Sequence, residues 1–164
     1  MKTEWFPLVN ETGETIGKAT RQECHSGSKQ LHPVIHLHIF NDNGDLYLQK
    51  RSMAKDIQPG KWDTAVGGHI DYGETVEEAL RREVREELGI TEFTPEFITS
   101  YVFESAIEKE LVNTFRTTYN GIITPDKEEL DGGRFWPLEE IKANLGKQVF
   151  TPNFEKEFSK LFLT

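Results

Sequence analysis

The chain has 164 residues, a length typical of one domain and sufficient to bury a hydrophobic core. Its formal net charge of -9 argues against a general affinity for nucleic acid or anionic membranes, because both partners are negatively charged. No segment is apolar for long enough to span a bilayer, and the N-terminal stretch lacks the apolar core of an export signal. The single cysteine, Cys24, cannot form an intramolecular disulfide. We therefore expect a cytoplasmic protein with one domain over residues 1–164.

The first half of the chain is predicted to form strands. Asn10–Gly13 and Asn41–Gly44 are rich in turn-forming residues and lie between extended runs, which indicates two hairpin turns. A polar loop containing Pro59-Gly60 comes before the last of these runs. We expect a hairpin within 4–22 and strands at 32–40, 45–50 and 62–66, the last ending in Gly67-Gly68.

A helix is predicted over 75–88. Apolar residues recur there at helical spacing, acidic residues occupy its first turn, and Gly89 is a natural stop. Three further strands are expected at 95–103, 111–123 and 133–136, and helices at 138–144 and 152–162. This order of elements predicts the α/β class, with a mixed β-sheet sandwiched between helices in an α/β/α sandwich.

Three acidic residues of the predicted helix carry its chemistry. Glu83, Glu86 and Glu87 stand at i, i+3 and i+4, so all three project from nearly one helical face. Like charges at this spacing repel each other, and a hard divalent cation would relieve the repulsion, since Mg²⁺ and Mn²⁺ prefer carboxylate oxygens. The alternative interpretation is an ordinary solvated, charged helix.

The segment Gly68–Ile90, GHIDYGETVEEALRREVREELGI, resembles the Nudix box at every defined position. The matching residues are Gly68, Glu74, Arg82, Glu83, Val84, Glu86, Glu87, Gly89 and Ile90. The resemblance implies the Nudix fold and a metal site formed by Glu83, Glu86 and Glu87 with the backbone carbonyl of Gly67. It also implies that Glu74 and Arg82 pair to brace the loop against the helix.

Diphosphate cleavage is the reaction that such a site implies. Bound cations stabilise the negative charge that develops on the phosphate oxygens, and they acidify an attacking water. Glu83 or Glu86 is our hypothesis for the carboxylate that accepts the proton of this water. The leading hypothesis is therefore a Mg²⁺- or Mn²⁺-dependent hydrolase of a nucleoside diphosphate derivative or a related small metabolite.

The flanking sequence resembles type 1 isopentenyl diphosphate isomerase, a family that shares the Nudix fold. The similar segments are Thr20–His25, Leu31-His32, Gln49–Arg51, Lys55, Pro59–Trp62 and Gly68-His69. By this resemblance, a second metal site would be formed by His25, His32, His69, Glu108 and Glu110, a ligand set that suits Mn²⁺ or Zn²⁺ better than Mg²⁺. The residues matching that family's diphosphate-binding positions are Arg21, Arg51 and Lys55, whereas His36 and His38 match nothing and are interpreted as structural.

The chain departs from the isomerase pattern at two positions. Gly67 stands where that family carries a cysteine, and Asn153 where it carries an essential tryptophan. An isomerase with altered catalytic groups and a diphosphate-binding module without turnover therefore remain as alternatives to the hydrolase. The resemblance also suggests a homodimer.

Overall fold

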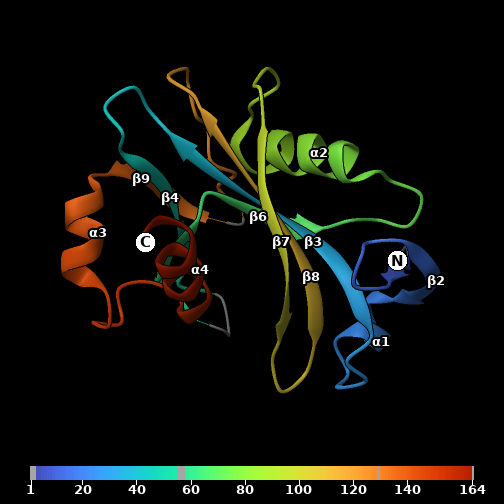
Figure 1. Cartoon of the computed structure of the whole chain (residues 1–164). Coiled ribbons are helices and arrows are strands. Elements are labelled where there is room, and N and C mark those ends of the chain that lie inside the picture. Colours follow the sequence, from blue (N-terminus) through green and yellow to red (C-terminus); the bar gives the residue numbers. More distant parts are fainter. Residues whose placement is uncertain (1–2, 55–57, 129, 164) are drawn as a thin grey trace. The chain divides into compact units, whose positions relative to one another are not determined.

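The computed structural model describes residues 3–54, 58–128 and 130–163 (Figure 1). Its strands are β1 (Trp5–Val9), β2 (Thr15–Thr20), β3 (Leu31–Phe40), β4 (Leu46–Arg51), β5 (Trp62–Thr64), β6 (Val66–His69), β7 (Glu96–Glu104), β8 (Lys109–Thr118) and β9 (Leu130–Trp136). Its helices are α1 (Arg21–Cys24), α2 (Val76–Leu88), α3 (Leu138–Asn144) and α4 (Pro152–Phe162).

The N-terminal hairpin forms as predicted and leads into a short helix. Strands β1 and β2 pair antiparallel, with Phe6 opposite Ala19. Helix α1 then begins with a capping box, in which the Thr20 side chain accepts from the backbone N–H of Glu23 and the Glu23 carboxylate accepts from that of Thr20. This helix was not among the predicted elements, and it places His25 directly after its last residue.

The remaining strands form a seven-stranded sheet. Its hydrogen-bonded order is β5-β4-β3-β8-β7, with β6 also paired to β3 and β9 to β4. In the antiparallel β7–β8 hairpin, Phe103 lies opposite Glu110. The described elements therefore give the α/β class that was predicted, with a mixed sheet and flanking helices.

Helix α2 agrees with its predicted pattern. Its apolar residues Ala79, Leu80, Val84 and Leu88 are fully buried. Gly89 follows with a φ of 69°, a left-handed conformation that glycine adopts without a steric penalty, and the helix ends there. The apolar stripe therefore packs in the interior and leaves the box glutamates on other faces.

Three of the predicted strands differ by more than one residue from those of the structure. The strand expected over 111–123 ends at Thr118. After it, the backbone N–H of Tyr119 donates to the Phe40 carbonyl and that of Thr124 donates to the Leu88 carbonyl, and neither bond continues the pairing of two strands. The segment expected as one strand over 62–66 is divided into β5 and β6, and β6 continues through Gly67 and Gly68. The last strand, expected over 133–136, begins three residues earlier at Leu130.

The residues group into two compact units, to both of which β3, β6, β8 and α2 contribute. The first comprises Met1–Leu37, Gly67–Glu83 and Pro95–Arg116, and the second comprises His38–Val66, Val84–Thr94 and Thr117–Thr164. The single domain expected over residues 1–164 stays a prediction.

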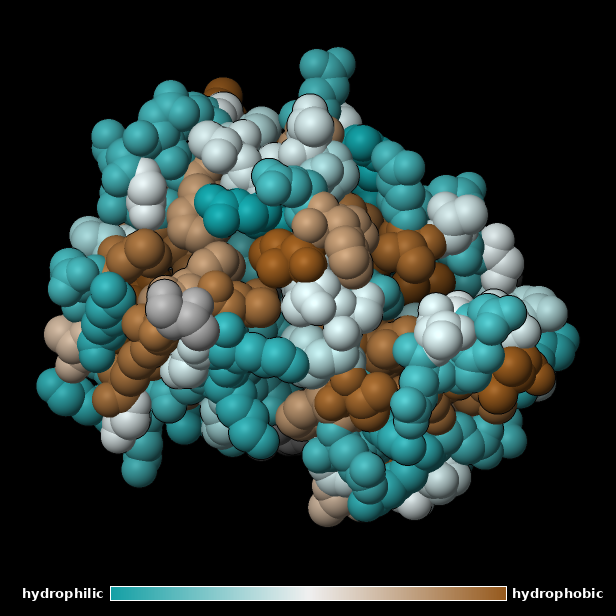
Figure 2. Space-filling model, viewed as in Figure 1, coloured by the Kyte–Doolittle hydropathy of each residue, from teal (hydrophilic) through white to brown (hydrophobic). Residues whose placement is uncertain are grey.

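Each unit has an apolar cluster of its own. In the first unit Phe6, Ala19 and Cys24 are buried together, with Leu8 packed against them. The second unit has a larger cluster that includes three phenylalanines of its C-terminal region, Phe150, Phe154 and Phe158. Hydrophobic side chains also gather on the visible surface over α4 (Figure 2). Over the part of the chain that is described, every helix is too short or too polar to cross a membrane.

Candidate functional site

Arg82 connects the loop of the box to its helix. Its guanidinium donates two hydrogen bonds to Glu74, at 2.7 and 2.9 Å, and one to the Glu83 carboxylate at 2.8 Å. A further bond, of 3.1 Å, reaches the backbone carbonyl of His69. Glu74 and Arg82 thus pair as expected, and the bonds from Arg82 hold the pKa of the Glu74 carboxyl below its usual value.

The two glycines before the loop have different surroundings. A Cβ atom at Gly68 would overlap the carboxylate of Glu83, so glycine leaves the space that this side chain occupies. A Cβ atom at Gly67 would lie 3.4 Å from Cδ2 of His36, an ordinary contact distance. A side chain at position 68 would therefore displace the Glu83 carboxylate, whereas position 67 has room for a Cβ atom.

The other two box glutamates follow on the same helix. Glu86 is exposed and Glu87 is half-buried. The side-chain amide of Gln49, on β4, lies 3.5 Å from Oε1 of Glu87 and donates a firmer bond of 2.9 Å to the Thr64 carbonyl. The Thr64 bond thereby holds the amide beside Glu87. The sequence did not predict this contact, since Gln49 appeared there only as part of the isomerase resemblance.

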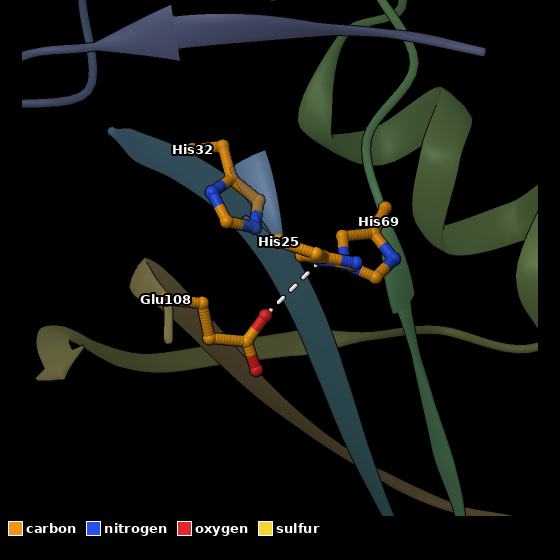
Figure 3. Close-up of side chains that lie close together, drawn as sticks. All are labelled: His25, His32, His69 and Glu108. Carbon is orange, nitrogen blue, oxygen red and sulfur yellow. Dashed lines mark ion pairs between the residues drawn. The ribbon is translucent and has the colours of Figure 1, made fainter. Parts of the chain in front are cut away.

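A second group of side chains converges within the first unit (Figure 3). His25 follows α1, His32 lies on β3, His69 ends β6, and Glu108 precedes β8. One ligand atom from each of these four lies within 4.8 Å of the other three. We call these four residues the histidine cluster; helix α1, the capped turn missed in the sequence, is what delivers His25 to it.

Two imidazoles of the cluster, those of His32 and His69, have the protonation state that metal ligands need. Burial lowers the pKa of His32, and it lowers the pKa of His69 to about 3, so both rings are neutral near pH 7. Nδ1 of His32 lies 3.0 Å from the Gln30 carbonyl and, as its donor, leaves the lone pair on Nε2. Nε2 of both His32 and His69 is buried without a hydrogen bond to any residue of the described ranges.

Two carboxylates complete this arrangement. Oε2 of Glu108 lies 3.1 Å from Nε2 of His25, and Oε2 of Glu110 lies 3.8 Å from Nε2 of both His32 and His69. Burial, with the charge of Glu108, raises the pKa of the Glu110 carboxyl to about 7. Buried nitrogen lone pairs next to carboxylate oxygens fit a divalent transition metal such as Mn²⁺ or Zn²⁺. The structure thus brings together all five residues that the isomerase resemblance indicated.

Phe6 is a neighbour of the cluster that the sequence did not reveal. Its ring is stacked on that of His69 with a centroid separation of 4.6 Å and an interplanar angle of 2°. An apolar residue on a strand is ordinarily a core residue, so its sequence context carried no signal for this contact.

The basic residues expected to bind diphosphate lie in different settings. Arg21 is exposed, pairs with Glu4 at 3.3 Å and lies close enough to the cluster for its charge to lower the pKa of His69. Arg51 lies 3.8 Å from Asp63, and Lys55 falls outside the described residues.

The two histidines interpreted as structural are not among the four residues of the histidine cluster. His38 is buried, and its Nε2 lies 2.6 Å from a carboxylate oxygen of Glu157 on α4. His36 is half-buried beside Gly67.

The chain is similar to known proteins in sequence and in fold. The NUDIX domain model matches residues 30–154. An uncharacterized Nudix hydrolase of Listeria monocytogenes is 36% identical, covering 92% of this chain and 89% of that protein. An isopentenyl-diphosphate Delta-isomerase of Mycolicibacterium vanbaalenii is 31% identical, covering 85% and 81%. A crystal structure from Deinococcus radiodurans, at 24% identity, has the same fold with a TM-score of 0.82 over 97% of this chain and 99% of that one.

The family match spans most of the chain and includes the whole box from Gly68 to Ile90. The chain therefore belongs to the Nudix family and is a Nudix hydrolase, one of a family that acts on pyrophosphate-type substrates.

Proposed function

We propose that this Nudix hydrolase uses Mg²⁺ or Mn²⁺ to cleave the diphosphate linkage of a nucleoside diphosphate derivative or a related small metabolite. The observation that carries the proposal is the complete box, with Glu83, Glu86 and Glu87 on one helix and Arg82 holding both Glu83 and the loop residue Glu74. A chain that only bound its ligand would not need every one of these groups.

The three glutamates and the Gly67 carbonyl would hold the cations of the hydrolytic site. When bound, divalent cations neutralise the charge of the phosphates and lower the pKa of the attacking water. Glu83 or Glu86 accepts the proton of this water. Arg82 keeps the Glu83 carboxylate in place before substrate arrives, so little reorganisation is needed when the substrate binds.

The histidine cluster, with Glu110, would hold a further cation, Mn²⁺ or Zn²⁺. The buried Nε2 atoms of His32 and His69 support this, since neutral, desolvated imidazoles are stabilised by coordination. Arg21 lies near the cluster and supplies a positive charge for a phosphate group. The roles of Arg51 and Lys55 in binding the diphosphate stay predictions.

The proposal is tested by screening diphosphate metabolites with the purified protein and Mg²⁺ or Mn²⁺, and reading products by mass spectrometry. On the substrate found, Glu86→Gln and Glu87→Gln should each lower kcat/KM by roughly 100-fold or more, because bound cations contribute several kcal/mol to the transition state. Glu77→Gln is the matched control, because Glu77 lies on the first turn of the same helix and pairs only with the surface residue Arg81 among the interactions described. Full activity in both box variants would contradict the proposed metal chemistry.

A second candidate is an isomerase with altered catalytic groups. The assembled histidine cluster and the similarity to a protein named isopentenyl-diphosphate Delta-isomerase favour it, whereas Gly67 and Asn153 stand where the resemblance would place a cysteine and a tryptophan. Product chromatography after incubation with isopentenyl diphosphate separates the two candidates. Isomerisation without cleavage would replace the hydrolase proposal, and tight diphosphate binding without any product would indicate the binding module.

We propose that the partner is a small-molecule diphosphate, with neither nucleic acid nor membrane as a ligand. The homodimer and the cytoplasmic location stay predictions from the sequence.

A further inference from the structure

Phe6 lies against all three imidazoles of the histidine cluster. Its ring is nearly parallel to His69, at 2° and 4.6 Å, and to His32, at 13° and 5.7 Å. His25 is tilted by 52° with a centroid separation of 6.2 Å. Phe6 itself is 1% exposed, so its ring closes this side of the cluster to water.

The strand that carries Phe6 is attached to the segments that carry the histidines. The backbone N–H of Tyr72, three residues after His69, donates to the Trp5 carbonyl at 2.8 Å. The backbone N–H of Arg21, at the start of the helix that leads to His25, donates to the Glu4 carbonyl at 3.0 Å. Backbone bonds on the N-terminal side of Phe6 therefore join its strand to the segments that carry two of the three imidazoles.

A ring face in contact with an imidazole restricts the rotation of that imidazole. Turning His69 about its last side-chain torsion would drive the ring edge into Phe6, because the two planes are only 2° apart. His32 is restricted in the same way by Phe6 and also by its Nδ1 contact with Gln30. Together these contacts keep Nε2 of each ring directed at the cluster instead of at the apolar core.

We propose that Phe6 is a positioning residue of the histidine cluster, whose ring holds the imidazoles of His69 and His32 in the orientation that binds a divalent cation. This inference rests on the proposed metal binding by the cluster. It adds a residue that is neither part of the box nor one of the metal-ligating types.

The test measures Co²⁺ binding by visible absorption, with no substrate present. Wild-type protein is compared with Phe6→Leu, which keeps an apolar side chain and loses the ring, and with Phe6→Tyr, which keeps the ring. His25→Ala, which lacks one ligand, gives the signal of Co²⁺ bound elsewhere. We expect Phe6→Leu to weaken Co²⁺ binding by roughly 10- to 100-fold, the range seen when the support of a metal ligand is removed, and Phe6→Tyr to restore most of it.

Leu8→Ala is the matched control for loss of packing. Leu8 lies two residues along the same strand and packs against the same apolar cluster as Phe6. It should lower stability and leave Co²⁺ binding unchanged. Equal affinity in wild type and Phe6→Leu overturns the role of Phe6 alone, whereas a wild type indistinguishable from His25→Ala overturns the metal site and the role of Phe6 with it.

A measurement on the metal-free wild type needs no variant to fold. A proton above an aromatic face is shifted upfield in the NMR spectrum, so the ring protons of His69 should be shifted further upfield than those of His25. Equal positions for the two imidazoles would show that Phe6 is not stacked on His69 in solution, and would overturn the proposal.

Discussion

Arg82 shows how one side chain sets the geometry of the box. It is only 22% exposed at the side chain and bonds to Glu74, to Glu83 and to the His69 carbonyl. These partners lie at the end of β6, on the loop that follows it and on helix α2, so the Arg82 side chain joins three segments of the box.

We therefore predict that Arg82→Ala lowers stability by about 1.5–3 kcal/mol, the cost of losing hydrogen bonds to charged groups, and also lowers kcat/KM. The control is Arg81→Ala, whose exposed pair with Glu77 at i,i+4 should be worth about 0.3–0.5 kcal/mol. Urea unfolding midpoints and Mg²⁺-dependent kinetics of both variants check this. Equal losses in the two variants would contradict it.

Tyr47 gives a prediction about pH. It is 4% exposed on β4, and burial raises its pKa from 10.0 to about 12. Its phenol keeps its proton longer in the folded than in the unfolded state, so its contribution to stability is complete below pH 10 and is lost as the pH rises through about 12. The unfolding midpoint of wild type should thus fall more steeply above pH 10 than that of Tyr47→Phe. Parallel curves for the two proteins would show that this phenol does not govern alkaline stability.

At the scale of elements, helix α4 is held by a buried pair. Nε2 of His38, on β3, lies 2.6 Å from Oε2 of Glu157, and both side chains are almost fully buried. Phe154 and Phe158 of the same helix are buried in the apolar cluster of the second unit. Removing Glu157 takes away this hydrogen-bond partner of the buried His38 imidazole.

Glu157→Ala should therefore lower the free energy of unfolding by about 1–3 kcal/mol, the usual cost of leaving a buried polar group without its hydrogen-bond partner. The neighbouring Lys156→Ala, at an exposed position of the same helix, should change it by less than about 0.5 kcal/mol. Denaturant unfolding followed by circular dichroism distinguishes the two. A loss in Glu157→Ala no larger than that in Lys156→Ala would mean that the pair does not hold the helix.

The same scale shows what the sequence could predict of the fold. Helix α2 was predictable because its periodic apolar residues and the stop at Gly89 are local features. Helix α1 was missed although its capping pair, Thr20 and Glu23, is visible in the sequence, because four residues carry no periodic pattern. The end of β8 was not predictable, since it depends on a backbone bond from Tyr119 to the distant Phe40.

Some functional residues could likewise be predicted from the sequence, and others could not. The box glutamates were found because their spacing along one helix expresses their chemistry directly. The histidine cluster was suggested by resemblance alone, because its members are separated by up to 83 residues and meet only through the fold. Phe6 had no local sign of any kind, since a stacking contact is a property of two distant segments.

At the scale of the whole molecule, the excess of acidic residues favours the binding of cations. The chain has 28 acidic and 19 basic residues, giving the net charge of -9, and its substrate class is also negatively charged. Divalent ions at the box and at the histidine cluster would relieve repulsion in the folded chain, where the ligands converge, and hardly at all in the unfolded chain.

Metal binding should consequently raise the thermal unfolding temperature. A ligand present at 100 times its Kd stabilises the folded state by about 2.7 kcal/mol, so Mn²⁺ added after chelation should produce a clear rise in Tm. The double variant Glu86→Gln, Glu87→Gln should lose the part of the Tm rise that metal binding at the box contributes. His25→Ala should lose the part that metal binding at the histidine cluster contributes. The two losses in Tm add if the sites are independent. They deviate from additivity if Arg82 couples the sites through its bonds to the His69 carbonyl and to Glu83. A Tm that Mn²⁺ leaves unchanged in the wild-type protein would contradict binding at either site.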